Sequence, residues 1–253
     1  MTTTDAGAPQ LDGAPLFLLD ELPETAELLV DGSEGRHAVD VLRLEPGERV
    51  RVGDGQGTVA EGEVVSAGPQ GLRVAVRARF EVPAPQPEFV LVQALPKGDR
   101  GPLAVDLATE LGVDRIVPWT ASRCVTRWRD DRVAKGVAKW RAAARAASKQ
   151  SRRPRVPEVT EPMSTREVCG LLGDADLAVV LHEQARRPMA GLTVPDSGTV
   201  AVVVGPEGGL TDGEVVAFRA AGAEPVRLGP EVLRTSTAGA AALAALSART
   251  RWR

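Results

Sequence analysis

A short proline-rich segment divides this 253-residue chain into two parts with different hydrophobic patterns. Residues 82–87 read Val-Pro-Ala-Pro-Gln-Pro. Closely spaced prolines favour an extended backbone and remove backbone donors, so no helix or paired strand is expected to cross the segment. We therefore predict a linker at 82–87, one domain over 15–81 and a second over 88–253, with a disordered tail over 1–14.

The part before the linker is predicted to be a small β-barrel. Short apolar segments separated by Gly, Pro and Asp turns recur at 16–19, 28–30, 49–52, 59–65 and 72–80. In the last of these, apolar residues alternate with arginines, which is the pattern of a strand with one solvated face. Residues 37–44 fit one short helix.

The part after the linker alternates between predicted strands and helices. Residues 89–95 form a continuous apolar run, as expected for a strand covered on both faces. Leu103, Leu107 and Leu111 share one face of a predicted helix that ends at Gly112. Further strands are expected at 115–117, 177–182, 199–204 and 226–228, and further helices at 131–150, 215–221 and 237–249. This alternation predicts an α/β domain with a parallel sheet.

The composition excludes several classes of protein. The chain has no tyrosine, two histidines and two distant cysteines, so a metal site or a histidine-dependent triad is not expected. The phosphate-loop and GxGxxG dinucleotide motifs are absent. The longest apolar run, 237–248, is too short to span a bilayer, so no membrane is expected. The cysteine usage fits a reducing cytoplasm.

Positive charge is concentrated in one segment. Between residues 123 and 155 there are twelve Lys or Arg and two acids, a charge of +10 in a chain whose net charge is −3. Such asymmetry is typical of proteins that bind a polyanion, although a merely solvated helix face is an equally good interpretation.

Two glycine-containing loops carry the strongest functional signal. The first, Gly-Pro-Glu-Gly-Gly-Leu at 205–210, links a buried strand to a helix whose capping box is Thr211 and Glu214. Glycines at such a position let backbone amides approach a ligand closely. The second, 228–238, ends in a Ser/Thr cap on an Ala-rich helix. A cation is disfavoured at a helix N-terminus, so we interpret Arg234 as a group presented to an anion or substrate.

Both loops closely resemble motifs of the bacterial 16S ribosomal RNA uracil-N3 methyltransferase family, a branch of the SPOUT α/β-knot methyltransferases. The loop sequences are GPEGGLTDGE (205–214) and LGPEVLRTSTA (228–238). The resemblance continues in ALPKGDR (94–100), ATELGVD (108–114) and AASKQSRR (146–153), and in the glycine, arginine and histidine pattern of 35–55. It covers residues 16–246.

The resemblance implies a PUA-like RNA-binding barrel, a trefoil-knotted methyltransferase domain and a homodimer. It also implies S-adenosylmethionine as cofactor and a uridine of 16S rRNA in the small ribosomal subunit as substrate, methylated at N3. Arg234 is then the candidate catalytic residue, with phosphate anchoring as its alternative role. Candidate cofactor-binding residues are Leu181, His182, Gly205, Pro206, Glu207, Gly208, Gly209, Leu228, Gly229, Leu233 and Thr237. Candidate RNA-binding residues are Arg36, His37, Arg43, Lys97, Arg123, Arg132, Lys135, Lys139, Arg145, Arg152 and Arg153.

Three positions depart from the family pattern. Lys149 replaces an acidic residue, Ser236 replaces a glutamate, and no basic residue stands near Phe17. Two alternatives stay open: a methyltransferase of the same superfamily acting on tRNA, and a non-catalytic RNA-binding or ribosome-assembly protein. Intact copies of both loops favour the enzyme, because a binding module has no need of them.

Overall fold

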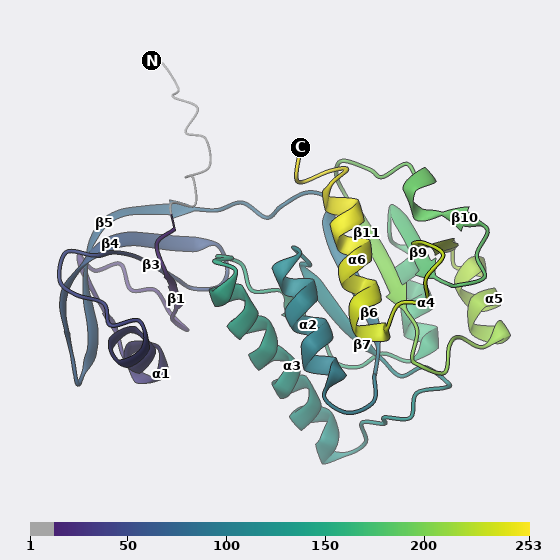
Figure 1. The fold of residues 1–253 in the computed structure, drawn as a ribbon, viewed down its shortest axis with the longest axis horizontal. Helices are drawn as coiled ribbons and strands as arrows, with labels where there is room; N and C mark the ends of the chain where they lie inside the picture. Colours follow the sequence, from purple (N-terminus) through teal and green to yellow (C-terminus); the bar gives the residue numbers. More distant parts are fainter. Residues whose placement is uncertain (1–12) are drawn as a thin grey trace. The chain divides into compact units, whose positions relative to one another are not determined.

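The computed structural model describes residues 13–253, which form two compact units (Figure 1). The first contains the chain up to Ala84 together with Ser148–Val156, and the second contains Pro85–Ala147 and Pro157–Arg253. All but the last two residues of the expected tail, 1–14, lie outside the described part.

The segment Ser148–Val156 corrects the predicted domain limits, which placed it in the second domain. Here Arg155 Nε donates a hydrogen bond to the Val82 carbonyl at 2.8 Å, and the Val156 amide donates to the Gly55 carbonyl at 2.8 Å. These two bonds, one donated by a side chain and one by the main chain, attach the segment to the first unit and are concealed by sequence separation.

The first unit is a five-stranded mixed sheet. Its strands are β1 (Leu16–Leu18), β2 (Glu27–Val30), β3 (Arg49–Gly53), β4 (Thr58–Gly68) and β5 (Gly71–Glu81), in the order β1-β3-β4-β5-β2. The pair β1–β3 is parallel, and the others are antiparallel. Each strand overlaps one predicted segment, and a core that includes Phe17, Leu28 and Leu72 lies beneath them.

The helical connection in this unit begins earlier than the expected helix at 37–44. It consists of α1 (Gly32–Arg36) and the π-helical turn η1 (His37–Val41). A Cβ on Gly35 would lie 2.4 Å from the Val30 carbonyl oxygen, so a glycine is needed for α1 to begin against β2. Local propensity does not reveal this close approach.

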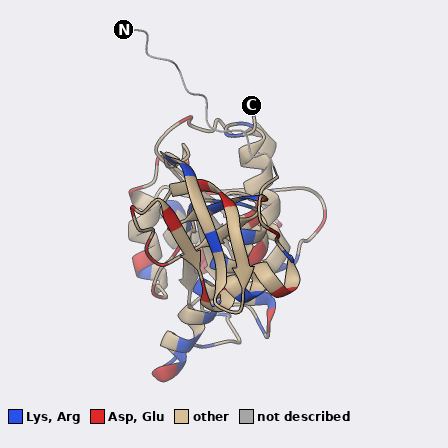
Figure 2. Cartoon of the chain, turned by 90° about the vertical axis from the view of Figure 1, so that its left-hand side faces the viewer, with Lys and Arg blue, Asp and Glu red and all other residues tan. Residues whose placement is uncertain are grey.

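Charged side chains on the sheet of the first unit pair across strands. Arg73 bonds Glu27 at 2.7 Å and Arg77 bonds Glu63 at 2.9 Å, and all four side chains are substantially exposed. Figure 2 shows both signs of charge on these strands. The predicted solvated face is therefore present, and each of its ion pairs contributes little to stability.

The second unit is built on a seven-stranded sheet in which every pairing is parallel. The strands lie in the order β10-β12-β9-β11-β6-β7-β8. They are β6 (Glu88–Ala94), β7 (Arg115–Trp119), β8 (Glu158–Val159), β9 (Leu177–Leu181), β10 (Arg187–Pro188), β11 (Thr199–Val204) and β12 (Glu224–Arg227). The helices are α2 (Arg100–Glu110), α3 (Asp131–Gln150), α4 (Thr165–Gly173), α5 (Asp212–Ala220) and α6 (Thr235–Ser247), with the 3-10 turn η2 (Met189–Gly191). The predicted α/β architecture is confirmed; α4, β8 and β10 were not predicted.

Helices cover both faces of this sheet, which explains its continuous apolar strands. Gly239 of α6 lies against Leu91 and Val204 on one face. Phe218 of α5 makes an edge-on contact with Trp119, with ring centroids 5.2 Å apart. Trp119 of β7 pairs with Ala94 of β6, and Ala94 is three residues from Leu91. Because successive side chains of a strand point to opposite faces, Trp119 and Leu91 lie on opposite faces of the sheet. Helix α5 therefore covers the face opposite to α6.

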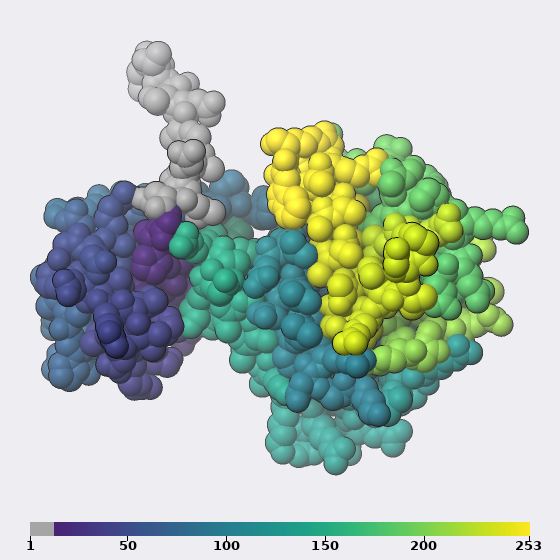
Figure 3. Space-filling model, viewed as in Figure 1, coloured from purple at the N-terminus to yellow at the C-terminus, as the bar shows by residue number. Residues whose placement is uncertain are grey.

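Helix α2 buries the face opposite to the one that its leucines predict. Leu103 is 46% exposed, and Leu107 and Leu111 are only half-buried. The buried residues are Gly101, Ala104, Val105, Ala108 and Thr109. Helices α2 and α6 lie side by side (Figures 1 and 3), and such close packing favours small residues over leucine.

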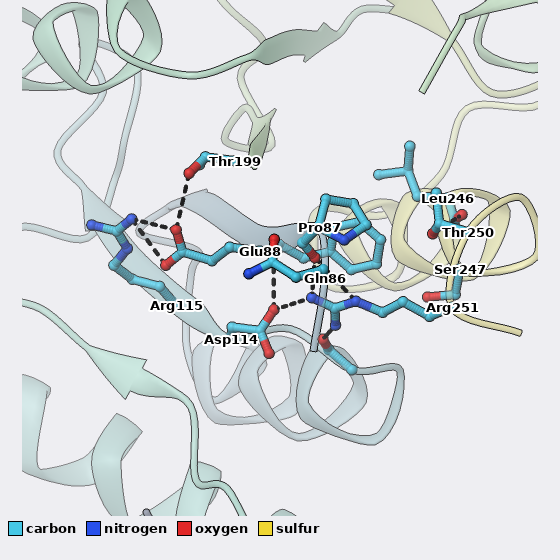
Figure 4. A network of polar contacts seen from close by, with 12 residues as sticks. Gln86, Pro87, Glu88, Asp114, Arg115, Thr199, Leu246, Ser247, Thr250 and Arg251 are labelled. Atoms are coloured by element: carbon cyan, nitrogen blue, oxygen red, sulfur yellow. Dashed lines mark hydrogen bonds and ion pairs between the residues drawn. The ribbon is translucent and has the colours of Figure 1, made fainter. Parts of the chain in front are cut away.

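One arginine near the C-terminus joins three segments of the second unit (Figure 4). The Arg251 guanidinium donates to the carbonyls of Pro87 and Gly112 and to the Asp114 carboxylate. It also lies 3.9 Å from the centroid of the Phe89 ring, in cation–π geometry. Because only a tenth of its side chain is exposed, water cannot replace these bonds without rearrangement.

Replacing Arg251 with alanine is expected to destabilise the second unit by about 2–4 kcal/mol, because two carbonyls lose this donor and the partly buried Asp114 carboxylate keeps the Phe89 amide but loses its bonded cation. Urea unfolding followed by tryptophan fluorescence measures this directly, since all four tryptophans lie in that unit. Arg253→Ala is the matched control: Arg253 pairs with Asp196 at the surface, so it should change stability by less than about 0.5 kcal/mol. Equal losses in the two variants would contradict the proposed role of Arg251.

Candidate functional site

A cleft of about 580 Å³ lies where the loops after β9, β11 and β12 meet. The carboxyl ends of parallel strands share one edge of a sheet, which is where α/β proteins bind ligands. Ten of the eleven candidate cofactor residues line this cleft: Leu181, His182, Gly205, Pro206, Glu207, Gly208, Gly209, Leu228, Gly229 and Leu233. Thr237 does not line it and is exposed on α6.

The loop after β11 is fixed by a buried carboxylate. Thr211 and Glu214 form the predicted capping box at the start of α5. Glu214 also accepts a hydrogen bond from the Ser122 amide at 2.8 Å, 92 residues away in sequence. Burial alone would raise the pKa of Glu214, but the hydrogen bonds from Ser122 and Thr211 outweigh burial and lower it. The carboxylate therefore stays charged and joins two loops.

Arg123 holds the same loop from its other side. Its Nη1 donates to the carbonyls of Gly208 at 3.1 Å and Leu210 at 3.0 Å. A Cβ on Gly208 would lie 3.1 Å from Arg123 Cβ, so the glycine permits this approach. The structure places the Arg123 guanidinium in the wall of the cleft, and its predicted contact with RNA stays a prediction.

Glu207 connects the cleft to the loop after β6. Its Oε1 accepts hydrogen bonds from the Lys97 amide at 3.1 Å and from Arg100 Nη1 at 3.4 Å. Its carboxylate therefore fixes the position of a neighbouring loop. Arg100, which sequence analysis missed, also lines the cleft.

The second glycine-containing loop is attached to the first through Thr235. The Thr235 hydroxyl donates to the Gly205 carbonyl at 2.8 Å and accepts from Gln93 Nε2 at 2.9 Å. The expected Ser/Thr cap is wrong: α6 begins at Thr235, Thr235 and Ser236 are buried within it, and no side chain caps it. The hydroxyl is used in the contact between loops instead. Gln93, the one polar residue inside the apolar run 89–95, was the overlooked signal.

Arg234 stands at the N-terminal end of α6 and lines the cleft. Its side chain is exposed, and within residues 13–253 no carboxylate pairs with it. The N-terminal end of the α6 dipole and the guanidinium both make the electrostatic potential at this place positive. The place therefore favours an anion, or a group that becomes negative during a reaction.

The remaining candidate RNA-binding residues occur in both units. In the second unit Lys97, Arg132, Lys135 and Lys139 are exposed and Arg145 is half-buried. In the first unit Arg36, His37, Arg43 and Arg152 are exposed and Arg153 is half-buried. On α3, Lys135 pairs with Asp131 and Lys139 pairs with Asp99, and the latter bond lowers the pKa of Asp99. Their role in binding RNA remains a prediction.

Two kinds of feature are absent from the described part of the chain, a metal-binding cluster and a membrane-spanning helix. Over 13–253, no group of three or more His, Cys, Asp or Glu side chains is placed to hold a metal ion. No helix in that range has both the length and the apolar character needed to cross a membrane.

Comparison with known proteins gives consistent matches along the chain. Residues 83–247 match the family model of an RNA methyltransferase domain, and residues 30–77 match that of an RNA methyltransferase PUA domain. A Mycobacterium tuberculosis protein named ribosomal RNA small subunit methyltransferase E is 46% identical over 245 residues, covering 94% of each chain. The Bacillus subtilis protein of that name is 29% identical over 241 residues, covering 91% of this chain and 93% of the relative.

A solved structure agrees with these matches. The crystal structure of ribosomal RNA small subunit methyltransferase E from Neisseria gonorrhoeae, bound to S-adenosyl methionine, has a TM-score of 0.80 at 28% identity. The match covers 94% of this chain and 98% of that one.

Glu214→Gln is expected to lower the free energy of unfolding of the second unit by about 1–2 kcal/mol at pH 7, because it weakens both the cap and the bond to Ser122. The depressed pKa of Glu214 gives stability that is complete above its ordinary value of 4.5 and is lost as pH falls through the folded value. The difference between wild type and variant should therefore shrink below pH 4.5.

Urea titrations at several pH values, read by tryptophan fluorescence, test this. Glu167→Gln is the matched control, since Glu167 forms the same capping box with Ser164 on α4 but is exposed and joins no second loop. We expect Glu167→Gln to lower the free energy of unfolding by less than Glu214→Gln does. A pH-independent difference for Glu214→Gln would contradict the charged, bridging carboxylate.

Proposed function

The chain belongs to the ribosomal RNA small subunit methyltransferase E family, and from this membership we propose that it methylates N3 of a uridine in 16S rRNA. The methyl donor is S-adenosylmethionine, bound in the cleft between the loops at 205–211 and 228–234. The observation that carries the proposal is the meeting of both glycine-containing loops and Arg234 at one cleft.

The residues of the cleft fit this cofactor. Glycines at 205, 208, 209 and 229 leave backbone groups accessible along its lining, and a Cβ on Gly205 would lie 3.0 Å from Leu210 Cδ2. Leu181, Leu228 and Leu233 supply apolar surface for an adenine ring. When bound, the cofactor supplies an electrophilic methyl group on its sulfonium.

The protein must then make N3 of uracil nucleophilic and hold it in line. The N3 proton leaves to solvent, and a bond forms from N3 to the methyl carbon as the carbon–sulfur bond breaks, which leaves the sulfur as a neutral thioether. Negative charge develops on the base as that proton departs. We assign its stabilisation to Arg234, because the α6 N-terminus and the guanidinium are already oriented at the cleft and need no reorganisation.

Several features support the proposed assembly. Leu103, Leu107 and Leu111 form an apolar stripe on α2 that the described residues leave partly exposed. A second copy of the chain that covers this stripe would bury it, in agreement with the homodimer that the family resemblance implies. The ribosomal substrate and the two unpaired cysteines support a cytoplasmic location.

The direct test is to incubate the purified protein with labelled S-adenosylmethionine and small ribosomal subunits that lack the modification. We expect label in 3-methyluridine at a single position of 16S rRNA. Transfer only to tRNA would favour the first alternative reading, and binding of the subunit without transfer would favour a non-catalytic protein.

Gly209→Val is expected to weaken S-adenosylmethionine binding at least tenfold. Gly209 has a φ of +70°, which a β-branched residue adopts only with strain, so the loop must change shape. Isothermal titration calorimetry measures the affinity. Gly213→Ala is the control in the same motif: Gly213 lies outside the cleft lining and has no neighbour within 4 Å of an added Cβ. Unchanged affinity in Gly209→Val would refute the role of this loop.

Arg234→Ala is expected to bind S-adenosylmethionine and the small subunit within a few-fold of wild type but to lose a hundredfold or more in single-turnover rate. A lost preorganised donor typically costs about 3–4 kcal/mol in the transition state. Arg219→Ala, an exposed arginine of α5 outside the cleft lining, is the control. If the variant keeps its rate at saturation but needs more subunit, Arg234 is a phosphate anchor.

Replacing Arg132 and Lys135 together with glutamine is expected to flatten the dependence of RNA affinity on salt. Each lost phosphate contact should reduce the slope of log K against log salt by about 0.7–0.9. Filter binding of the small subunit across a salt series measures it, with the exposed Arg253→Gln as control. A wild-type slope would mean that this part of α3 is only solvated.

A further inference from the structure

A second, smaller cavity of about 150 Å³ lies between the loop after β6, the segment that precedes α3, and α3 itself. Trp128 and Trp140 form its aromatic part, with ring centroids 5.2 Å apart and an angle of 79° between the rings. Trp128 is half-buried and Trp140 is 2% exposed. A cavity of about this size is large enough for a benzene ring. We call it the tryptophan pocket.

Glycines allow both indoles to contact main chain directly. A Cβ on Gly136 would lie 2.4 Å from Trp128 Cε2, and a Cβ on Gly101 would lie 2.7 Å from Trp140 Nε1. Buried indole N–H groups normally have an acceptor. Trp119 Nε1 has such an acceptor in Thr165. Across residues 13–253 no group accepts from Trp140 Nε1, and this atom is not one of the fully buried polar atoms without a partner, so it keeps access to a ligand in the pocket that Trp140 lines. The pocket thus offers a ring-sized space with a hydrogen-bond donor in its wall.

The charge around the tryptophan pocket indicates its ligand. Lys139 lines it, and exposed Arg127 and Arg129 flank Trp128 in sequence. All of these residues belong to the segment with a charge of +10 between 123 and 155. Flat rings carried on a polyanion are the chemistry of a single-stranded nucleic acid, in which bases stack on aromatic side chains.

We propose that the tryptophan pocket binds one unpaired base of the RNA substrate, stacked on Trp128, with a base carbonyl accepting from Trp140 Nε1. The proposal rests on the proposed function for the identity of the polymer. It adds a second base-binding site, separate from the cleft where the target uridine is methylated.

One loop lies between the two sites. Leu95, Pro96 and Gly98 of the loop after β6 border the tryptophan pocket, while Arg100, the first residue of α2 after this loop, lines the cleft. Glu207 holds this loop through the Lys97 amide and Arg100. A base in the pocket would therefore fix the position of the RNA relative to the methylation site, and recognition of a neighbouring nucleotide would contribute to the choice of target.

The test compares two labelled oligomers, octauridylate and an octamer of abasic ribose phosphate, by fluorescence anisotropy at low salt. In wild type we expect octauridylate to bind more tightly. Trp128→Ala should weaken octauridylate about tenfold, in the range for one stacked base, and leave the abasic octamer unchanged. Trp128→Phe, which keeps an aromatic face, should retain most of the affinity. Trp252→Ala removes an exposed tryptophan and should change neither.

Equal binding of the two oligomers by wild type, or no binding of either, would overturn the proposal. So would an equal loss for both oligomers in Trp128→Ala, which would indicate a general structural effect. Failure of the proposed function is a separate result. It would appear as a lack of methylation of the small subunit by wild type, independently of the affinities for the two oligomers.

Discussion

The bonds of a single threonine hydroxyl hold the candidate site together. Thr235 connects the carbonyl of Gly205, at the end of β11, to the amide of Gln93, at the end of β6. These groups are buried at the edge of an apolar sheet, where an unpaired polar group costs about 1–3 kcal/mol. The bonds pair the Gly205 carbonyl and the side-chain NH2 group of Gln93, whereas the buried Gln93 Oε1 has no partner among residues 13–253. They also set where α6 begins and therefore where Arg234 stands. Glu214, Arg123 and Glu207 then fix the loop that Thr235 anchors.

Much of the fold follows from hydrophobic patterning, because strands covered on both faces and strands with one wet face have different periods. The sequence also reveals the two loops, since their glycines and the Thr211–Glu214 cap are local signals. The bonds from Glu214 to Ser122 and from Glu207 to Lys97 leave no such signal, because each joins segments about a hundred residues apart. Helix α4 does have a local signal, the capping box that begins at Ser164, which was overlooked in the sequence analysis.

Two predictions failed because tertiary contacts outweighed local preference. The leucines of α2 suggested a buried stripe, but the alanine-rich surface of α6 packs against small residues. The small residues of α2 are therefore buried in place of its leucines. The hydroxyl residues before α6 suggested a cap, but Thr235 is used for the contact between loops. In both cases the departure lies at the site or next to it, where function constrains the sequence as strongly as stability does.

The segment Ser148–Val156 has a consequence for the order in which the chain acquires its structure. The first unit is not contiguous in sequence, since its last part follows more than sixty residues of the second unit. During synthesis from the N-terminus the five strands emerge first, but the bonds to Val82 and Gly55 must wait for residues 155 and 156. At typical translation rates that delay is several seconds. The N-terminal unit is thus translated first but can be completed only after much of the second unit has been made.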